Sequence, residues 1–156
     1  MTVLLRKAAL LTAGSLVLAS VAMAGVPSAA NSTVPPCITL VGSLAGTPDD
    51  IGLFIVTVRD LAGSPQDGAS VTVDFSGCPD IRICSDQLDL NVITNCAAKT
   101  VRCKTCAAGR ARFGILGGSN GSGNATCLLG GAKIYANGVL IGSPTAAVFD
   151  LDGANG

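Results

Sequence analysis

Hydrophobic and polar residues alternate with a period of two in several short stretches of the chain. Residues 71–75 read Val-Thr-Val-Asp-Phe, and residues 111–115 read Ala-Arg-Phe-Gly-Ile. Because successive side chains of a β-strand point to opposite faces of a sheet, this period predicts strands with one buried and one solvated face. Residues 53–58 are almost all apolar, which predicts a strand buried on both faces or at the centre of a sheet.

Turn-forming residues separate these stretches. Residues 60–68 include two glycines, a proline and an aspartate, each of which favours a turn for its own conformational reason. Asn137-Gly138 lies between two apolar runs and predicts a type I′ hairpin turn, in which both residues have positive φ. Further strands are expected over residues 38–41, 100–102, 125–129, 133–141 and 145–149. Seven or eight short strands without a convincing helix after residue 24 predict an all-β, antiparallel β-sandwich.

The N-terminal segment differs from the rest of the chain. Arg6 and Lys7 precede an apolar run over residues 8–21, and Ala22-Met-Ala24 follows as a small-residue cleavage site. This order is typical of a helical secretory signal peptide over residues 1–24, and it predicts a secreted, extracellular or cell-surface protein. We expect a flexible leader over 25–36, one sandwich domain over 37–149 and a polar tail over 150–156. No later stretch is apolar enough to suggest a membrane span.

Composition narrows the chemistry. The chain has no His, Trp or Glu, and residues 25–156 carry 8 basic against 10 acidic residues. The basic residues are scattered along the sequence and aromatics are few, so no nucleic-acid partner is expected. Without His, no Ser-His-Asp triad can form. The six aspartates between Asp60 and Asp89 fall in turns and on solvated strand faces, so we predict structural roles for them and no enzyme activity.

Cysteines are the remaining reactive residues, and disulfides are the default for them in an exported protein. There are seven, all after the leader: Cys37, Cys78, Cys84, Cys96, Cys103, Cys106 and Cys127. Residues 77–98 read as a long polar insertion with a short strand at 90–93, which we expect to be tied by a disulfide among Cys78, Cys84 and Cys96.

Two further cysteine pairs could form a disulfide, Cys37 with Cys127 and Cys103 with Cys106. Cys37 and Cys127 could join the first strand to a late one. Cys103-Lys-Thr-Cys106 has the spacing of a redox motif or of half a zinc site; structural disulfides rank first, zinc second and redox chemistry third. An odd number of cysteines leaves at least one thiol free or available for a bond between molecules.

Two segments together resemble the bacterial immunoglobulin-like domains of the invasin and intimin type. Their family patterns are V-x-D-x-x-G-x-P-V-x-G-A-x-V and T-D-x-x-G-x-A-x-F. The matching residues are Asp60, Gly63, Pro65, Gly68, Ala69 and Val71 in the first, and Thr105, Gly109, Ala111 and Phe113 in the second. Gln66 stands where the family usually has an apolar residue, and Cys106 replaces the Asp.

This resemblance covers residues 38–149 apart from the insertion. It implies an immunoglobulin-like sandwich that serves as a structural or adhesive module, without catalytic residues. The implied partners are other extracellular protein modules or cell-surface components.

The C-terminal residues resemble the opening of a dockerin-like or EF-hand-like calcium loop. Asp150 and Asp152 would take positions 1 and 3, where calcium requires oxygen ligands, and Asn155 comes one place late for the next. No residue is present for position 12, so we expect no cofactor, and calcium only if the chain continues past Gly156.

The alternative function is a carbohydrate- or ligand-binding sandwich, attached to an extracellular degradative system through a missing dockerin-like module. Glycan recognition usually presents exposed aromatic rings, and the chain has no Trp and one Tyr. A structural or adhesive function is therefore the preferred prediction.

Overall fold

The computed structural model describes residues 25–41, 43–44, 47–48, 52–83, 87, 89–120, 126–127 and 131–149. The expected signal peptide, the polar tail with its calcium-loop residues, and Cys84 lie outside these residues. The strands are β1 (Cys37–Val41), β2 (Ser43–Leu44), β3 (Thr47–Pro48), β4 (Leu53–Thr57), β5 (Ser70–Asp74), β6 (Ile81–Ile83), β7 (Ile93–Asn95), β8 (Thr100–Lys104), β9 (Arg110–Gly114), β10 (Gly117–Ser119), β11 (Thr126–Cys127), β12 (Lys133–Ala136), β13 (Val139–Gly142) and β14 (Thr145–Phe149).

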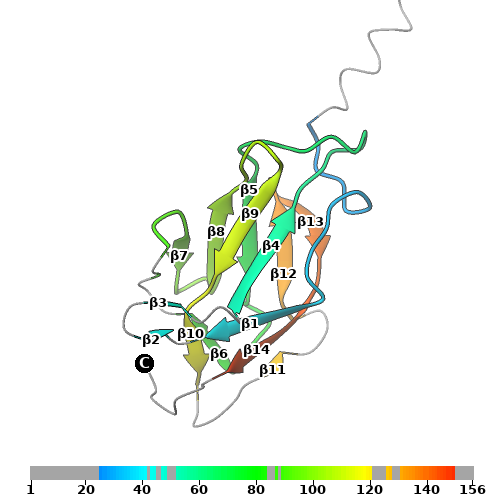
Figure 1. Cartoon of the computed structure of the whole chain (residues 1–156). Helices are drawn as coiled ribbons and strands as arrows, with labels where there is room; N and C mark the ends of the chain where they lie inside the picture. The colour runs from blue at the N-terminus through cyan, green and yellow to red at the C-terminus, as the bar shows by residue number, and fades with distance from the viewer. Residues whose placement is uncertain are drawn as a thin grey trace, which may run out of the picture.

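The strands form two layers, and this confirms the predicted all-β sandwich (Figure 1). One layer is an antiparallel sheet in the order β13-β12-β5-β8-β7. The other layer contains the antiparallel pair β4-β9 and the sheet β1-β14-β11. β1 runs parallel to β14, which the sequence pattern did not predict, and β11 runs antiparallel to β14. The pairs β10-β6 and β2-β3 are shorter additions.

The core between the layers is built from the residues that alternate in the sequence. Val71, Val73 and Phe75 have no exposed surface, and the same holds for Phe113. The rings of Phe54 and Phe113 stack with their centroids 5.2 Å apart. Burial of such side chains is the main source of stability in a sandwich, because each removes a large apolar area from water. The period-two prediction is therefore confirmed at both segments.

The apolar run over residues 53–58 is buried on one face only, so the expectation of two buried faces is wrong. Val56 and Val58 are fully buried, whereas Ile55 is 49% exposed. The reason is that one face of the β4-β9 pair packs on the core, whereas its outer face, which carries Ile55, Arg110 and Arg112, is exposed.

The predicted type I′ hairpin joins β12 to β13. Asn137 has φ of 47° and Gly138 has φ of 83°. The Asn137 side-chain oxygen accepts a hydrogen bond from the Ser70 amide at 2.9 Å, which ties the turn to the start of β5. The turn prediction is confirmed.

The stretch 77–98 is part of the sandwich, which corrects its description as a polar insertion that cannot hold itself by burial. Ile81, Ile83 and Val92 belong to the core. β6 pairs with β10, and the sequence pattern predicted a strand at neither position. The second strand of the stretch is β7 and begins at Ile93, whereas Leu90 is 96% exposed.

Residues 25–36 also belong to the domain, so their description as a separate leader is wrong. The Ser28 amide donates to the Arg59 carbonyl at 2.8 Å, and Thr33 and Thr57 exchange two backbone hydrogen bonds. The Asn31 side chain donates to the carbonyl of Asp60 at 2.9 Å. These contacts place the segment along β4 and the turn after it.

Candidate functional site

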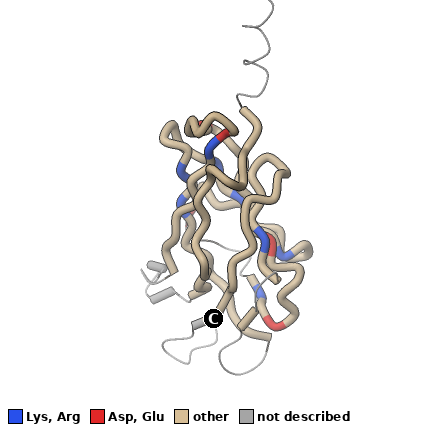
Figure 2. Tube along the Cα trace, turned by 90° about the vertical axis from the view of Figure 1, so that its right-hand side faces the viewer, with Lys and Arg blue, Asp and Glu red and all other residues tan. Residues whose placement is uncertain are grey.

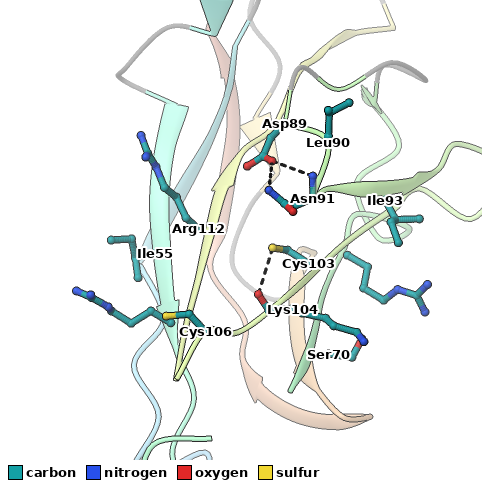
Figure 3. Close-up of a pocket in the computed structure, with 12 residues that line it drawn as sticks. Ile55, Ser70, Asp89, Leu90, Asn91, Ile93, Cys103, Lys104, Cys106 and Arg112 are labelled. Atoms are coloured by element: carbon teal, nitrogen blue, oxygen red, sulfur yellow. Dashed lines mark hydrogen bonds between the residues drawn. The ribbon is translucent and has the colours of Figure 1, made fainter. Parts of the chain in front are cut away.

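An open groove of about 930 Å³ lies between β8 and β9, where the two layers meet. The 89–91 turn before β7 closes one end of it (Figure 3). We call it the cationic groove; it is lined by Ile55, Ser70, Asp89, Leu90, Asn91, Ile93, Arg102, Cys103, Lys104, Cys106, Arg110 and Arg112.

The groove exists because β8 and β9 follow each other in sequence but join different sheets. β8 pairs with β5, and β7 accompanies it only as far as Arg102. β9 pairs with β4. The turn that connects β8 to β9 is closed by the Gly109 amide, which donates to the Cys106 carbonyl at 2.7 Å. Beyond this turn, β8 and β9 separate instead of continuing as one hairpin, and the space between them is the groove.

Four cations line the groove. Arg102 and Lys104 alternate with buried residues on β8, and Arg110 and Arg112 do the same on β9. This is half of the eight Lys and Arg residues that follow residue 24. Figure 2 shows the positively and negatively charged residues along the described chain. Among the described residues, none of the four forms an ion pair. The basic residues are scattered along the sequence, and the fold brings four of them to one groove.

Among the described residues, one acidic side chain lines the groove. The Asp89 carboxylate accepts hydrogen bonds from the backbone amide and the side-chain amide of Asn91, both at 2.9 Å. These bonds orient the carboxylate toward its own turn (Figure 3). The balance of charge in the groove is therefore strongly positive.

Two free thiols, three positions apart, also line the groove. Cys103 is buried and its thiol donates to the Lys104 carbonyl at 3.4 Å. Burial raises the pKa of this thiol, and the negative charge of Asp89 raises it further. Cys106 is exposed, and hydrogen bonds from the backbone amides of Arg110 and Ala108 lower the pKa of its thiol. Cys106 is thus the more reactive of the pair at neutral pH.

The disulfide differs from the expected one. Cys78 bonds to Cys127 with a Cα–Cα distance of 5.3 Å, so neither a bridge from Cys78 within the 77–98 stretch nor a Cys37–Cys127 bridge forms. Cys37 and Cys96 carry exposed free thiols. The bridge crosses from the end of β5 to β11, a pairing that no local spacing signals. It fits a protein that matures outside the cytoplasm.

The metal and carboxylate candidates do not form a site within the described residues. The part of the chain that the structure describes contains no group of three or more His, Cys, Asp or Glu side chains arranged to hold a metal ion. The calcium-loop candidates Asp150, Asp152 and Asn155 lie outside that part. Asp60, the first of the six aspartates considered, is buried, and its carboxylate accepts from the amides of Ala62 and Ser64. Its role is to hold the turn after β4.

Comparison with known proteins does not assign the chain to a family. No protein-family model matches the sequence, and no curated protein matches it. Among the described residues, no helix is long and apolar enough to cross a membrane.

Sequence reasoning missed the groove although its signal was present. The cations occupy alternate positions, Arg102-Cys-Lys104 and Arg110-Ala-Arg112, and these segments overlap the predicted strands at 100–102 and 111–115. This pattern places each pair on one strand face. Only the fold shows that the two pairs flank one groove.

Proposed function

We propose that this chain is an exported immunoglobulin-like module that acts by binding outside the cell, in adhesion or assembly, and that the cationic groove is its binding surface. The observation that carries the proposal is the set of four cations around one groove, none of which forms an ion pair within the described part of the chain. Cations that have no carboxylate partner at a concave surface attract an anionic ligand.

Export is supported by two independent features. The first 24 residues have the order of charge, apolar run and small residues of a signal peptide. The Cys78–Cys127 disulfide is the kind of bond that persists in an oxidising compartment. The likeness to invasin-type segments points the same way, since it implies a spacing or adhesive role.

The chemistry of the groove supports binding over catalysis. The one carboxylate among its described lining residues, on Asp89, already accepts two hydrogen bonds from Asn91. A general acid or base needs a group that is free to exchange a proton near neutral pH, and guanidinium groups do not do so. The four cations suit the positioning of an anion.

The test uses the full chain produced in its own host. We expect protein outside the cell to begin at Gly25 and to bind to the surface of the producing cells or to their extracellular material, with binding that weakens as salt rises. Arg110→Gln/Arg112→Gln should reduce this binding. Arg82→Gln/Lys133→Gln is the matched control, because it also removes two exposed positive charges but outside the groove.

Protein that stays inside the cell with residues 1–24 attached would contradict export. Equal binding by both double variants would contradict the assignment of the groove as the binding surface.

A further inference from the structure

Each of the two groove strands presents two cations with one residue between them. On β9 these are Arg110 and Arg112, and on β8 they are Arg102 and Lys104. Alternate residues of a strand are about 6.6–6.8 Å apart on the same face. Carboxylates at alternate positions of an extended peptide have the same spacing. A row of carboxylates on such a peptide therefore matches the row of cations on one groove strand.

An exposed aliphatic side chain lies beside a cation on each strand. Ile55 is paired across β4-β9 with Arg112 and is 49% exposed. Ile93 is paired across β7-β8 with Arg102 and is 57% exposed. Directly paired residues have Cβ atoms about 4.5–5.5 Å apart. A ligand that reaches the cations therefore also meets apolar surface.

These two observations favour a protein ligand over other polyanions. The groove lining contains no aromatic residue that could stack on a sugar ring or a base. Its concave shape suits an extended segment better than the flat surface of a membrane. Leu90, which is 96% exposed in the turn at the end of the groove, adds a further aliphatic contact.

Recognition through side chains is favoured over the addition of a strand to β9. The Arg110 carbonyl on β9 already accepts a hydrogen bond from the Cys106 amide at 2.9 Å. An added strand would have to displace this contact. The charged rows, in contrast, are exposed and ready to pair.

We propose that the cationic groove binds an extended acidic segment of a partner protein, in which acidic residues occupy alternate positions and so share one face. This inference rests on the proposed function and names the class of its ligand. Arginine, which supplies three of the four cations, pairs with carboxylates through two parallel hydrogen bonds.

The experiment compares two fluorescent eight-residue peptides with residues 25–156. One alternates Asp with Leu, and the other has the same composition as a block of four Asp followed by four Leu. We expect the alternating peptide to bind several-fold more tightly, and Arg110→Gln/Arg112→Gln to weaken it by roughly 2- to 30-fold, since each exposed ion pair contributes about 0.2–1 kcal/mol. Arg82→Gln/Lys133→Gln should leave binding within twofold.

A second readout locates the peptide. Cys106 is the exposed thiol of the groove, so in a Cys37→Ser/Cys96→Ser background its alkylation should be slowed by the alternating peptide and much less by the block peptide. Circular dichroism and thermal unfolding of each variant exclude misfolding as the cause of lost binding.

Several outcomes would overturn the inference. These are equal affinity for both peptides, equal loss in the two double variants, unprotected Cys106, or stronger binding to alginate, heparin or anionic vesicles than to the alternating peptide. Binding to the producing cells together with failure to bind the peptide would reject this ligand class and leave the proposed function standing. Peptide binding without cell binding would reject the proposed function alone.

Discussion

Thr105 joins two loops through a single buried hydroxyl group. It donates to the Gln66 carbonyl at 2.6 Å and accepts from the Ala69 amide at 2.8 Å. Thr105→Val leaves both backbone groups without a partner, so we expect the free energy of unfolding to fall by about 2–4 kcal/mol in urea titrations. Thr105→Ser keeps the hydroxyl and should lose at most about 1 kcal/mol for the missing methyl group. Equal losses would show that the hydroxyl has no such role.

Gln66 has a buried amide nitrogen without a hydrogen-bond partner among the described residues. The family that this segment resembles has an apolar residue here. Because an unsatisfied buried donor is destabilising, Gln66→Met should raise stability by about 1 kcal/mol, seen as a melting temperature about 4 °C higher. Gln66→Glu should lower it, since burial disfavours a charge. A less stable Gln66→Met protein would contradict this account.

The two groove thiols should differ in reactivity with pH. A lowered pKa gives Cys106 a larger thiolate fraction at any pH below its ordinary value of 9.0, whereas Cys103 has a raised pKa and is buried. Iodoacetamide reacts with the thiolate, so Cys106 should be alkylated first, at a lower pH than an ordinary thiol, and Cys103 last. Peptide mapping after labelling between about pH 6 and 9 measures the order. Faster labelling of Cys103 would refute the assignment.

At the scale of elements, residues 25–36 act as an irregular edge to β4. Their hydrogen bonds go to Arg59, Thr57 and Asp60, and Val34 packs against the core. The free energy of unfolding of a protein that begins at Cys37 should therefore be about 2–5 kcal/mol lower than that of a protein that begins at Gly25.

Chemical denaturation of the two proteins measures this difference. Asn31→Ala is the point control: it removes only the two side-chain bonds to Asp60 and Leu61, and should cost about 1 kcal/mol. Equal stability of the two lengths would restore the description of this segment as a leader.

The Cys78–Cys127 disulfide acts on the whole molecule, because it joins the end of β5 to β11 across a sequence separation of 49. A cross-link limits the freedom of the unfolded chain, and a loop of this length corresponds to about 4 kcal/mol. Cys78→Ser/Cys127→Ser should lose about this amount. The control Cys37→Ser/Cys96→Ser removes two exposed free thiols and should change stability by less than about 0.5 kcal/mol. Similar losses in both would contradict a role for the bridge.

The segments that the sequence predicted well are those in which local chemistry is sufficient. Strands β5 and β9 follow from alternation alone, because a strand repeats every two residues and one face must be buried. The hairpin at Asn137-Gly138 follows from the backbone conformation that these two residues tolerate. The all-β class and the sandwich follow in turn from the number of such strands.

Sequence reasoning failed where an element depends on a distant partner. β6 and β10 look like loop segments, and they become strands because each pairs with the other. Ile55 looks like a core residue, and it is exposed because β4 has no neighbour on its outer face among the described residues. β-propensity depends on such context more than helix propensity does.

By itself, then, the sequence determined the class of the fold, the position of its principal strands and turns, and the residue types available for chemistry. Tertiary structure alone decided the partner of Cys78 and the groove between β8 and β9. The physical reason is that alternation and turn chemistry act over a few residues. The bonding of Cys78 to Cys127 and the placement of the β8 and β9 cations along one groove depend on how the chain packs across the two layers.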